Sequence, residues 1–165
     1  MPNTTMRELV EARGGVTRGE LVEAAKTWIG TPYVHRQRLK GVAADCIQFL
    51  IGVCEDLEIF PAWVDKEIGT TQYSTQWHLH NNEELLIKHV ELIGLDEKPI
   101  NQMRKGDLIG FQFGNATAHL GMVENKNFMI HAAMLPPAKV HRARLTLGWR
   151  KRITKCWSIP NVRDR

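Results

Sequence analysis

Between residues 45 and 57 the apolar positions recur with the period of a helix. They form one face of a 3.6-residue repeat, made of Ile47, Leu50, Ile51, Cys54 and Leu57. Asp45 precedes this face, and an aspartate at that position accepts hydrogen bonds from the free backbone N–H groups of the first helical turn. The pattern therefore predicts a helix with Asp45 as its N-cap and Cys46 at its first position.

A second helix is predicted upstream, beginning at Thr17. Thr17 and Glu20 have the spacing of a capping box, in which each side chain bonds to the backbone N–H of the other residue. Gly30 is a natural stop for this helix. The apolar stripe between these two ends consists of Leu21, Ala24, Ala25 and Trp28.

The pattern changes from helical to extended after residue 105. A last helix is predicted over residues 83–93, and Lys105-Gly106-Asp107 is a turn that leads into strands. The predicted strands are 108–111, 118–124, 128–132 and 153–159. Helices followed by a meander of strands indicate an α+β fold, in which the helix that begins at Cys46 packs on an antiparallel sheet.

The length of 165 residues indicates one domain that can bury a sizeable core. Within residues 1–165 we expect an N-terminal arm over 1–16 and an insertion over about 60–95. The basic segment 140–165 is expected to be a C-terminal extension.

The charge balance is only mildly basic, with 22 Lys and Arg against 18 Asp and Glu, a net charge of +4. This charge is too small and too dispersed to predict nucleic-acid binding, although it suits an anionic partner such as a cell-wall polymer. The three cysteines form no CxxC pair, so a disulfide framework is not expected. We also expect no membrane span, and synthesis in a reducing cytoplasm without a signal peptide, because the N-terminus is polar and long apolar runs are missing.

Cys46 is the candidate nucleophile. The unpaired N–H groups and positive dipole end of a helix N-terminus favour a thiolate at that position. His119 and His131 lie in two predicted strands joined by a tight turn, which can bring them side by side. A cysteine nucleophile needs a base, and the base needs a group that orients it, so these residues fill the roles of base and orienter.

Other interpretations of the same residues remain open. A cysteine on a buried helix face is often inert, and single histidines in strands are often structural. Cys46, His119 and His131 are also compatible with a zinc site, in which case activity would be sensitive to a chelator. His78 and His80 form an HxH pair, which is most often incidental on a surface, and no metal or cofactor is predicted there.

Five blocks of the sequence, in order, resemble the NlpC-type cell-wall peptidases, which are papain-like cysteine endopeptidases. The blocks are Gly30-Thr31-Pro32-Tyr33, Asp45-Cys46, Lys105-Gly106-Asp107-Leu108, His119-Leu120-Gly121-Met122-Val123 and Ile130-His131-Ala132. The Arg-rich loop and the isoleucine after the cysteine resemble the branch found in tailed phages and gene-transfer agents.

The resemblance implies a papain-like core with Cys46 as nucleophile, His119 as base and His131 as the orienting residue. It also implies that Tyr33 lies beside the site and that Asp45 meets the free amine of the substrate. The implied substrate is a peptidoglycan stem peptide, cleaved between D-glutamate and a diamino acid. Family members commonly carry Ser-Gly after the cysteine, whereas this chain has Ile47-Gln48, which removes a polar contact from the substrate cleft.

Three residues of the loop before the cysteine, Arg36, Arg38 and Lys40, are candidates to bind the carboxylates of the stem peptide, or else form a solvated basic face. A cell-wall enzyme without a signal peptide fits a tail-tip subunit, which is assembled inside the cell and held by a hub or baseplate protein. The alternatives are a structural tail-tip plug with weak or no activity, and a related acyltransferase or amidase.

Overall fold

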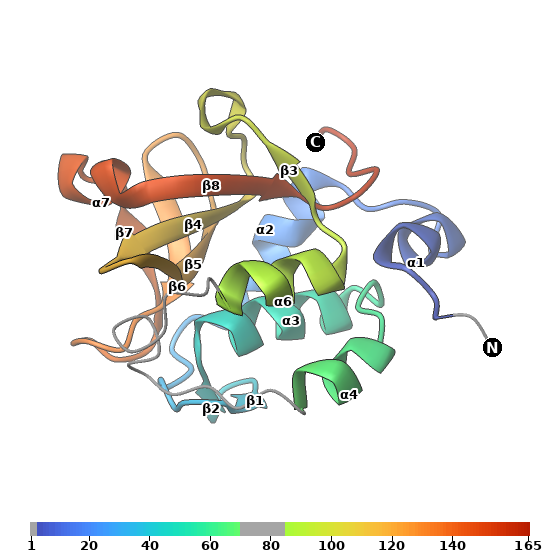
Figure 1. Ribbon diagram of the computed structural model, residues 1–165, viewed down its shortest axis with the longest axis horizontal. Helices are drawn as coiled ribbons and strands as arrows, with labels where there is room; N and C mark the ends of the chain where they lie inside the picture. Colours follow the sequence, from blue (N-terminus) through green and yellow to red (C-terminus); the bar gives the residue numbers. More distant parts are fainter. Residues whose placement is uncertain (1–2, 70–84) are drawn as a thin grey trace.

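The computed structural model describes residues 3–69 and 85–165. Within them, an antiparallel six-stranded sheet is covered by helices (Figure 1). The helices are α1 (Met6–Ala12), α2 (Arg18–Lys26), α3 (Cys46–Asp56), α4 (Trp63–Gly69), α6 (Leu85–Ile93), α7 (Leu147–Arg152) and the 3₁₀ turn η1 (Ile100–Gln102). The sheet consists of β3 (Asp96–Lys98), β8 (Ile153–Ser158), β4 (Leu108–Phe113), β5 (Ala116–Val123), β6 (Phe128–Ala132) and β7 (Val140–Arg144), in that order. A separate hairpin pairs β1 (Arg38–Leu39) with β2 (Ala43–Ala44).

The predicted caps hold the N-termini of two helices. Thr17 Oγ1 accepts from the Glu20 N–H at 3.1 Å, and the Thr17 N–H donates to Glu20 Oε2 at 2.7 Å. Asp45 Oδ1 accepts from the Gln48 N–H at 2.8 Å, so α3 begins at Cys46 as predicted. Helix α2 ends at Lys26, four residues before Gly30, because residues 27–30 continue as turns.

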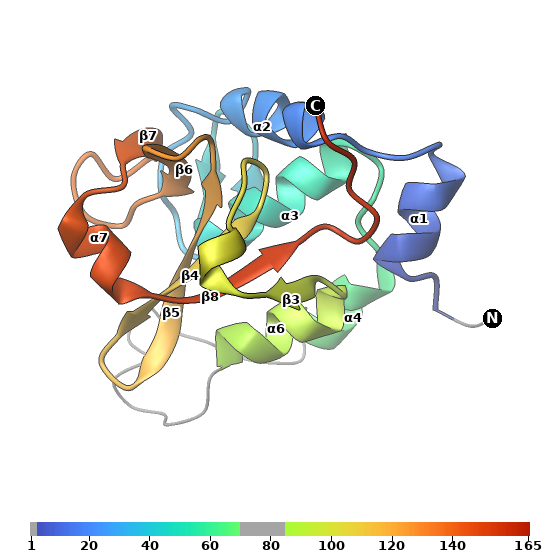
Figure 2. The ribbon, with the colours of Figure 1, turned by 90° about the horizontal axis from the view of Figure 1, so that it is seen from above.

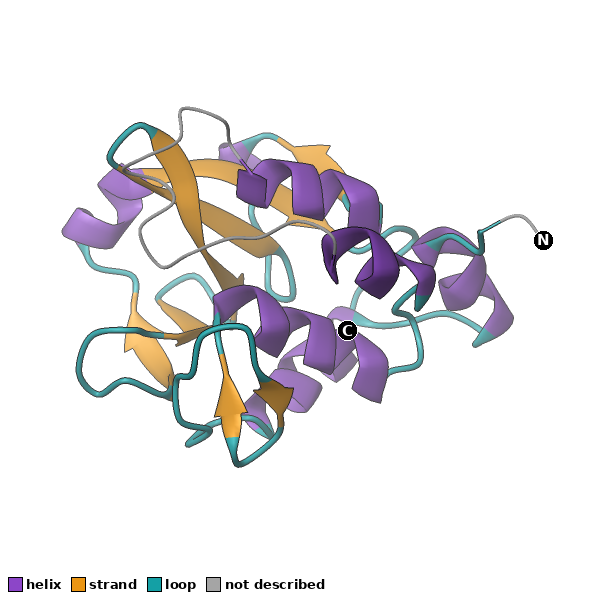
Figure 3. Ribbon diagram, turned by 60° about the horizontal axis from the view of Figure 1, so that its bottom comes forward, coloured by secondary structure: helices purple, strands orange, loops and turns teal. Residues whose placement is uncertain are grey.

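Helix α3 lies at the centre of the fold. Its predicted apolar face is buried except for the half-buried Leu57, and Phe49 and Val53 on other sides of the helix are buried as well. Helix α2 packs against one side of α3 and β5 packs against another, while α6 lies alongside it (Figures 1 and 3). A helix buried on several sides is a rigid support for whatever stands at its first residue.

Strand β8 is a central strand, paired with β3 on one side and with β4 on the other. Segment 140–165, which the sequence assigns to an extension, therefore supplies two strands of the main sheet. The end of this segment also returns to α2, where the Arg163 N–H donates to Val16 O at 2.9 Å. The segment is part of the fold because its apolar residues Val140, Cys156 and Trp157 are fully buried.

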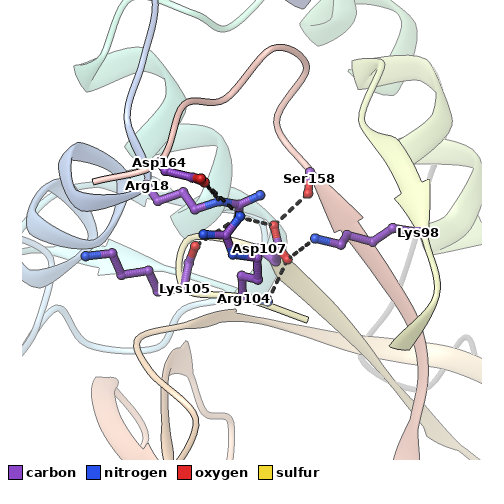
Figure 4. A network of polar contacts seen from close by, with 7 residues as sticks. All are labelled: Arg18, Lys98, Arg104, Lys105, Asp107, Ser158 and Asp164. Atoms are coloured by element: carbon purple, nitrogen blue, oxygen red, sulfur yellow. Dashed lines mark hydrogen bonds and ion pairs between the residues drawn. The ribbon is translucent and has the colours of Figure 1, made fainter. Parts of the chain in front are cut away.

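A buried carboxylate fastens three parts of the fold to each other (Figure 4). Asp107 Oδ1 accepts from Arg18 Nη1 at 2.7 Å and from Ser158 Oγ at 2.6 Å, so it ties β4 to α2 and β8. Asp107 Oδ2 accepts from Lys98 Nζ and the Arg104 N–H, both at 2.8 Å. Burial alone would raise the pKa of Asp107, but these hydrogen bonds outweigh it and hold the pKa below its usual value.

In the described part of the chain, every helix is too short or too polar to cross a bilayer.

Candidate active site

A cavity of about 680 Å³ opens where the N-terminus of α3 meets strands β5, β6 and β7. Helix α7, β6 and β7 lie together at the end of the molecule opposite α1 (Figures 1 and 2). The cavity walls are largely apolar and include Ile47, Leu86, Phe113, Met134, Leu135, Pro136 and Trp149. The polar lining residues include five that the sequence singles out, namely Tyr33, Asp45, Cys46, His119 and His131.

Cys46 lies at the floor of this cavity and is only 9% exposed. Burial and the negative charge of Asp45 raise the pKa of the Cys46 thiol to about 12, although the N–H groups of Leu120, Ile47 and Cys46 itself act in the opposite direction. The helix N-terminus is expected to favour a thiolate, but desolvation outweighs the favourable field there. Cys46 is a neutral thiol at neutral pH.

His119 and His131 lie within hydrogen-bonding distance, with His119 Nε2 and His131 Nδ1 separated by 2.7 Å. The β5–β6 register, extended by one pair, sets His131 opposite Gly121, one step along the same face from His119. Gly121 lies close to His131 and Met129, since a Cβ at Gly121 would lie 3.4 Å from the Cβ of His131 and 3.1 Å from the Met129 sulfur.

A β-bulge directs His119 toward the cavity. Phe111 pairs with His119 and Gln112 pairs with Thr117, so Ala118 is the extra residue. Bulges re-aim neighbouring side chains and are common beside active sites. The N–H of Leu120, the next residue after His119, faces the Cys46 sulfur, which brings the α3 N-terminus against this part of β5.

Both histidines are neutral at neutral pH. Burial and the positive charge of His141 lower the pKa of His119 to about 4. Burial and the charges of His119 and His141 lower the pKa of His131 to about 2. A neutral imidazole can serve as a general base for a neutral thiol, taking the thiol proton during attack rather than before it.

The sequence interpretation missed His141, one of two further histidines, with His35, that line this cavity within the described part of the chain. His141 in β7 pairs directly with His131 in β6, and their ring centroids are 4.6 Å apart. The signal in the sequence is weak, because β7 reads Val-His-Arg-Ala-Arg and its exposed positions carry charged residues.

Tyr33 and Asp45 border Cys46 from the loop side. Burial, together with the charges of Cys46 and Asp45, raises the pKa of Tyr33, so its hydroxyl remains a donor. Asp45 Oδ2 accepts from the Arg36 N–H at 2.7 Å, while Oδ1 caps α3. Asp45 thus fixes the loop before the nucleophile, and its contact with a substrate amine stays a prediction.

Two of the three basic loop residues that were candidates to bind substrate carboxylates are bound elsewhere. Arg38 contacts Glu55 at 2.9 Å and Asp65 at 2.7 Å, and Lys40 contacts Asp56 at 2.6 Å. None of Arg36, Arg38 and Lys40 lines the cavity. The ion pairs of Arg38 and Lys40 hold the loop against α3 and α4.

The zinc interpretation gains no support from the structure. Within residues 3–69 and 85–165, no group of three His, Cys, Asp or Glu side chains is placed to hold a metal ion. His78 and His80 lie outside the described residues. Cys46, Cys54 and Cys156 are all unpaired and buried, which confirms that no disulfide joins them.

The chain matches no protein-family model and no curated protein sequence. Solved structures do match its fold. The NlpC/p60 domain of the peptidoglycan hydrolase SagA is 18% identical with a TM-score of 0.56, over 87% of this chain and 99% of that one. The fold is that of the NlpC/p60 domains.

Two further structures with the NlpC/p60 fold agree. The p60 domain of antigen MAP1204 from M. avium subspecies paratuberculosis is 16% identical with a TM-score of 0.57, over 88% of this chain and 96% of that one. NlpC1 from Trichomonas vaginalis is 16% identical with a TM-score of 0.56, over 88% of this chain but only 45% of its own. The predicted α+β, papain-like fold class is thereby confirmed.

Proposed function

We propose that the protein is a cysteine endopeptidase that cleaves peptidoglycan stem peptides. The observation that carries the proposal is the meeting of Cys46 with the His119–His131 pair in one cavity of an NlpC/p60 fold. The hydrolase named among the structural neighbours, SagA, acts on peptidoglycan. The motif blocks of this chain resemble the same class of enzyme.

In the proposed reaction, His119 takes the proton of the Cys46 thiol as the sulfur attacks a peptide carbonyl. His119 Nε2 is engaged with His131, so Nδ1 is the nitrogen available for this transfer. Backbone N–H groups beside Cys46 stabilise the oxyanion, and one such donor typically contributes about 10²–10³-fold in rate. The protonated His119 then gives its proton to the leaving amine, and water hydrolyses the thioester.

The experiment is digestion of defined muropeptides, with products identified by mass spectrometry. Wild type is expected to release fragments cut between D-glutamate and the diamino acid, and Cys46→Ala to release none. Cys54→Ala is the matched control, because Cys54 is equally buried but lies outside the cavity. Intact muropeptides after incubation with a folded wild-type protein would overturn the proposal.

For the place of action we propose a tail-tip subunit of a phage or gene-transfer agent, held by a hub or baseplate protein. The support is the resemblance of the Arg-rich loop and of the Cys46-Ile47 dipeptide to that branch. Proteomics of purified particles tests it. Absence from particles, with the protein left in the lysate supernatant, would contradict it.

A structural plug is the second candidate, favoured by one observation. Ile47 is 5% exposed and lines the cavity where relatives commonly carry a serine, so the wall beside the nucleophile is apolar. The plug hypothesis predicts presence in particles together with no cleavage of any muropeptide, and the two experiments above separate it from the peptidase.

A further inference from the structure

Arg152, the last residue of α7, stands at the edge of the catalytic cavity. Among the described residues that line the cavity, it is the only arginine or lysine. It lines the cavity from the end of α7, whereas Asp45 lines it from the N-terminus of α3. The cavity therefore presents a cation and an anion from two different walls.

The aromatic ring of Phe113 holds the Arg152 guanidinium near His119, the proposed base. Its central carbon lies 4.7 Å from the centroid of the Phe113 ring, and Nη1 donates to Gln112 O at 3.3 Å. The Phe113 ring is in edge contact with the His119 ring, their centroids 6.4 Å apart. One aromatic ring thus separates the guanidinium from the imidazole that we propose as base.

The charge of Arg152 is not balanced by a carboxylate in the described part of the chain. Several arginines there do have carboxylate partners, such as Arg18 with Asp107 and Arg38 with Glu55, but none of these lines the cavity. Arg152 instead donates one weak hydrogen bond to a backbone carbonyl. A guanidinium carries five N–H donors in a planar fork that matches a carboxylate, so most of its binding capacity is open to a ligand.

We propose that Arg152 forms a subsite that binds a carboxylate of the substrate, on a residue adjoining the scissile bond. The inference rests on the proposed peptidase function and assigns to α7 the role that the sequence assigned to the basic loop. Stem peptides suit it, because carboxyl groups flank their D-glutamate–diamino acid bond. Arg152 then determines specificity and takes no part in proton transfer.

The test compares stem peptides with free carboxylates against the same peptides in which one flanking carboxyl is a carboxamide. Wild type is expected to cleave the carboxylate form about 10–100-fold more efficiently than one of the carboxamides, as expected for a charge-assisted bidentate contact. Arg152→Gln should cleave both forms at the carboxamide rate of wild type. Arg152→Lys should recover part of the preference, because it keeps the charge but loses the fork.

Lys151→Gln is the matched control, since it removes an exposed charge one residue away that does not line the cavity. It should keep the wild-type preference. Equal rates on both peptides in wild type, or an equal loss on both in Arg152→Gln, would overturn the subsite. If wild type cleaves no peptide, the peptidase proposal fails, and the subsite is then tested by titrating the same peptides onto Cys46→Ala, with the same discrimination expected in Kd.

Discussion

At the scale of a single residue, the hydrogen bond of His119 Nε2 to His131 determines which ring nitrogen of His119 can accept a proton. Because Nε2 contacts His131, a base that accepts at Nδ1 must carry its own proton on Nε2 and donate it to His131 Nδ1. That places the proton of His131 on Nε2, which is buried and has no partner within residues 3–69 and 85–165. In the proposed mechanism, His131 would therefore fix the tautomer of His119 through this hydrogen bond.

This arrangement predicts unequal effects of two substitutions. His119→Ala should lower kcat/KM by about 10²–10⁴-fold, the usual contribution of a general base. His131→Asn should cost less, because the amide oxygen can still accept from His119 Nε2. Steady-state kinetics on one muropeptide measures both. Equal and complete loss in the two variants, with chelator-sensitive wild-type activity, would favour zinc instead.

The pKa of His119 predicts the acid side of the pH profile. His119 must be neutral to act as base, and its pKa is lowered to about 4, mainly by burial and secondly by the charge of His141. Activity is thus expected to persist below pH 6 and to fall as the pH drops through about 4. His141→Gln should move this limb upward. The measurement is kcat/KM against pH, with circular dichroism at each pH as control, and a limb near 6.5 in wild type would contradict it.

The site residues that the sequence predicted are those with local signals. Cys46 follows an N-cap, and His119 and His131 flank a turn of a few residues. Arg152 has no such signal, because its importance comes from Phe113, which lies 39 residues earlier in the chain (152 − 113) and meets it only in the folded sheet. The sequence also could not predict that the Cys46 thiol is protonated, because the burial that raises its pKa comes from the whole cavity.

For the secondary-structure elements, Gly52 determines how closely Trp28, in the turn after α2, packs on α3. A Cβ at Gly52 would lie 2.2 Å from the Trp28 ring. That ring cannot move away easily, because Trp28 is 3% exposed and its Nε1 donates to Asp56 at 2.8 Å. The first turn of α3, which carries Cys46, depends on this packing.

Gly52→Ala is therefore expected to lower the free energy of unfolding by about 1–3 kcal/mol, the usual cost of overpacking a core. Gly148→Ala is the control, because a Cβ at that helical position would make only an ordinary contact, 3.8 Å from Thr146 Oγ1. It should be neutral or stabilising by up to about 1 kcal/mol, since alanine is the better helix former. Urea unfolding of both variants measures the difference, and equal midpoints would contradict the expectation.

Strong periodicity predicted α2, α3, α6 and four of the sheet strands. The strands β3 and β7 were missed because charged side chains occupy their exposed positions, as suits the two edges of a sheet. Helix α7 was missed because six residues are too few to show a period. Pairing in the sheet, not local preference, stabilises these elements.

For the whole molecule, the hydrogen bonds of Asp107 couple stability to pH. Its folded pKa lies below the unfolded value, so its contribution is present above the unfolded pKa, near 4, and is lost as the pH falls through the folded pKa. Asp107→Asn should lower the free energy of unfolding at pH 7 by about 3–5 kcal/mol, as for a broken buried ion pair. Wild type should lose this advantage progressively below pH 4.

Denaturant unfolding between pH 2.5 and 7 checks this dependence. Asp164→Asn is the control, because Asp164 also contacts Arg18 but is exposed. Its unfolding should keep most of the wild-type pH dependence, because the ion pairs of Asp164 lie at the surface and are screened by solvent. If Asp107→Asn varied with pH as steeply as wild type, the Asp107 network would not be the cause.

The position of β8 affects when the protein can fold during its synthesis. β8 lies between β3 and β4 but follows both in the chain, so these two strands lack a shared partner until residues 153–158 have been synthesised. Pairings between distant segments also form slowly. A chain still emerging from the ribosome thus has the nucleophile and both histidines but no completed sheet to hold them, and catalytic competence is expected to arise in one late step.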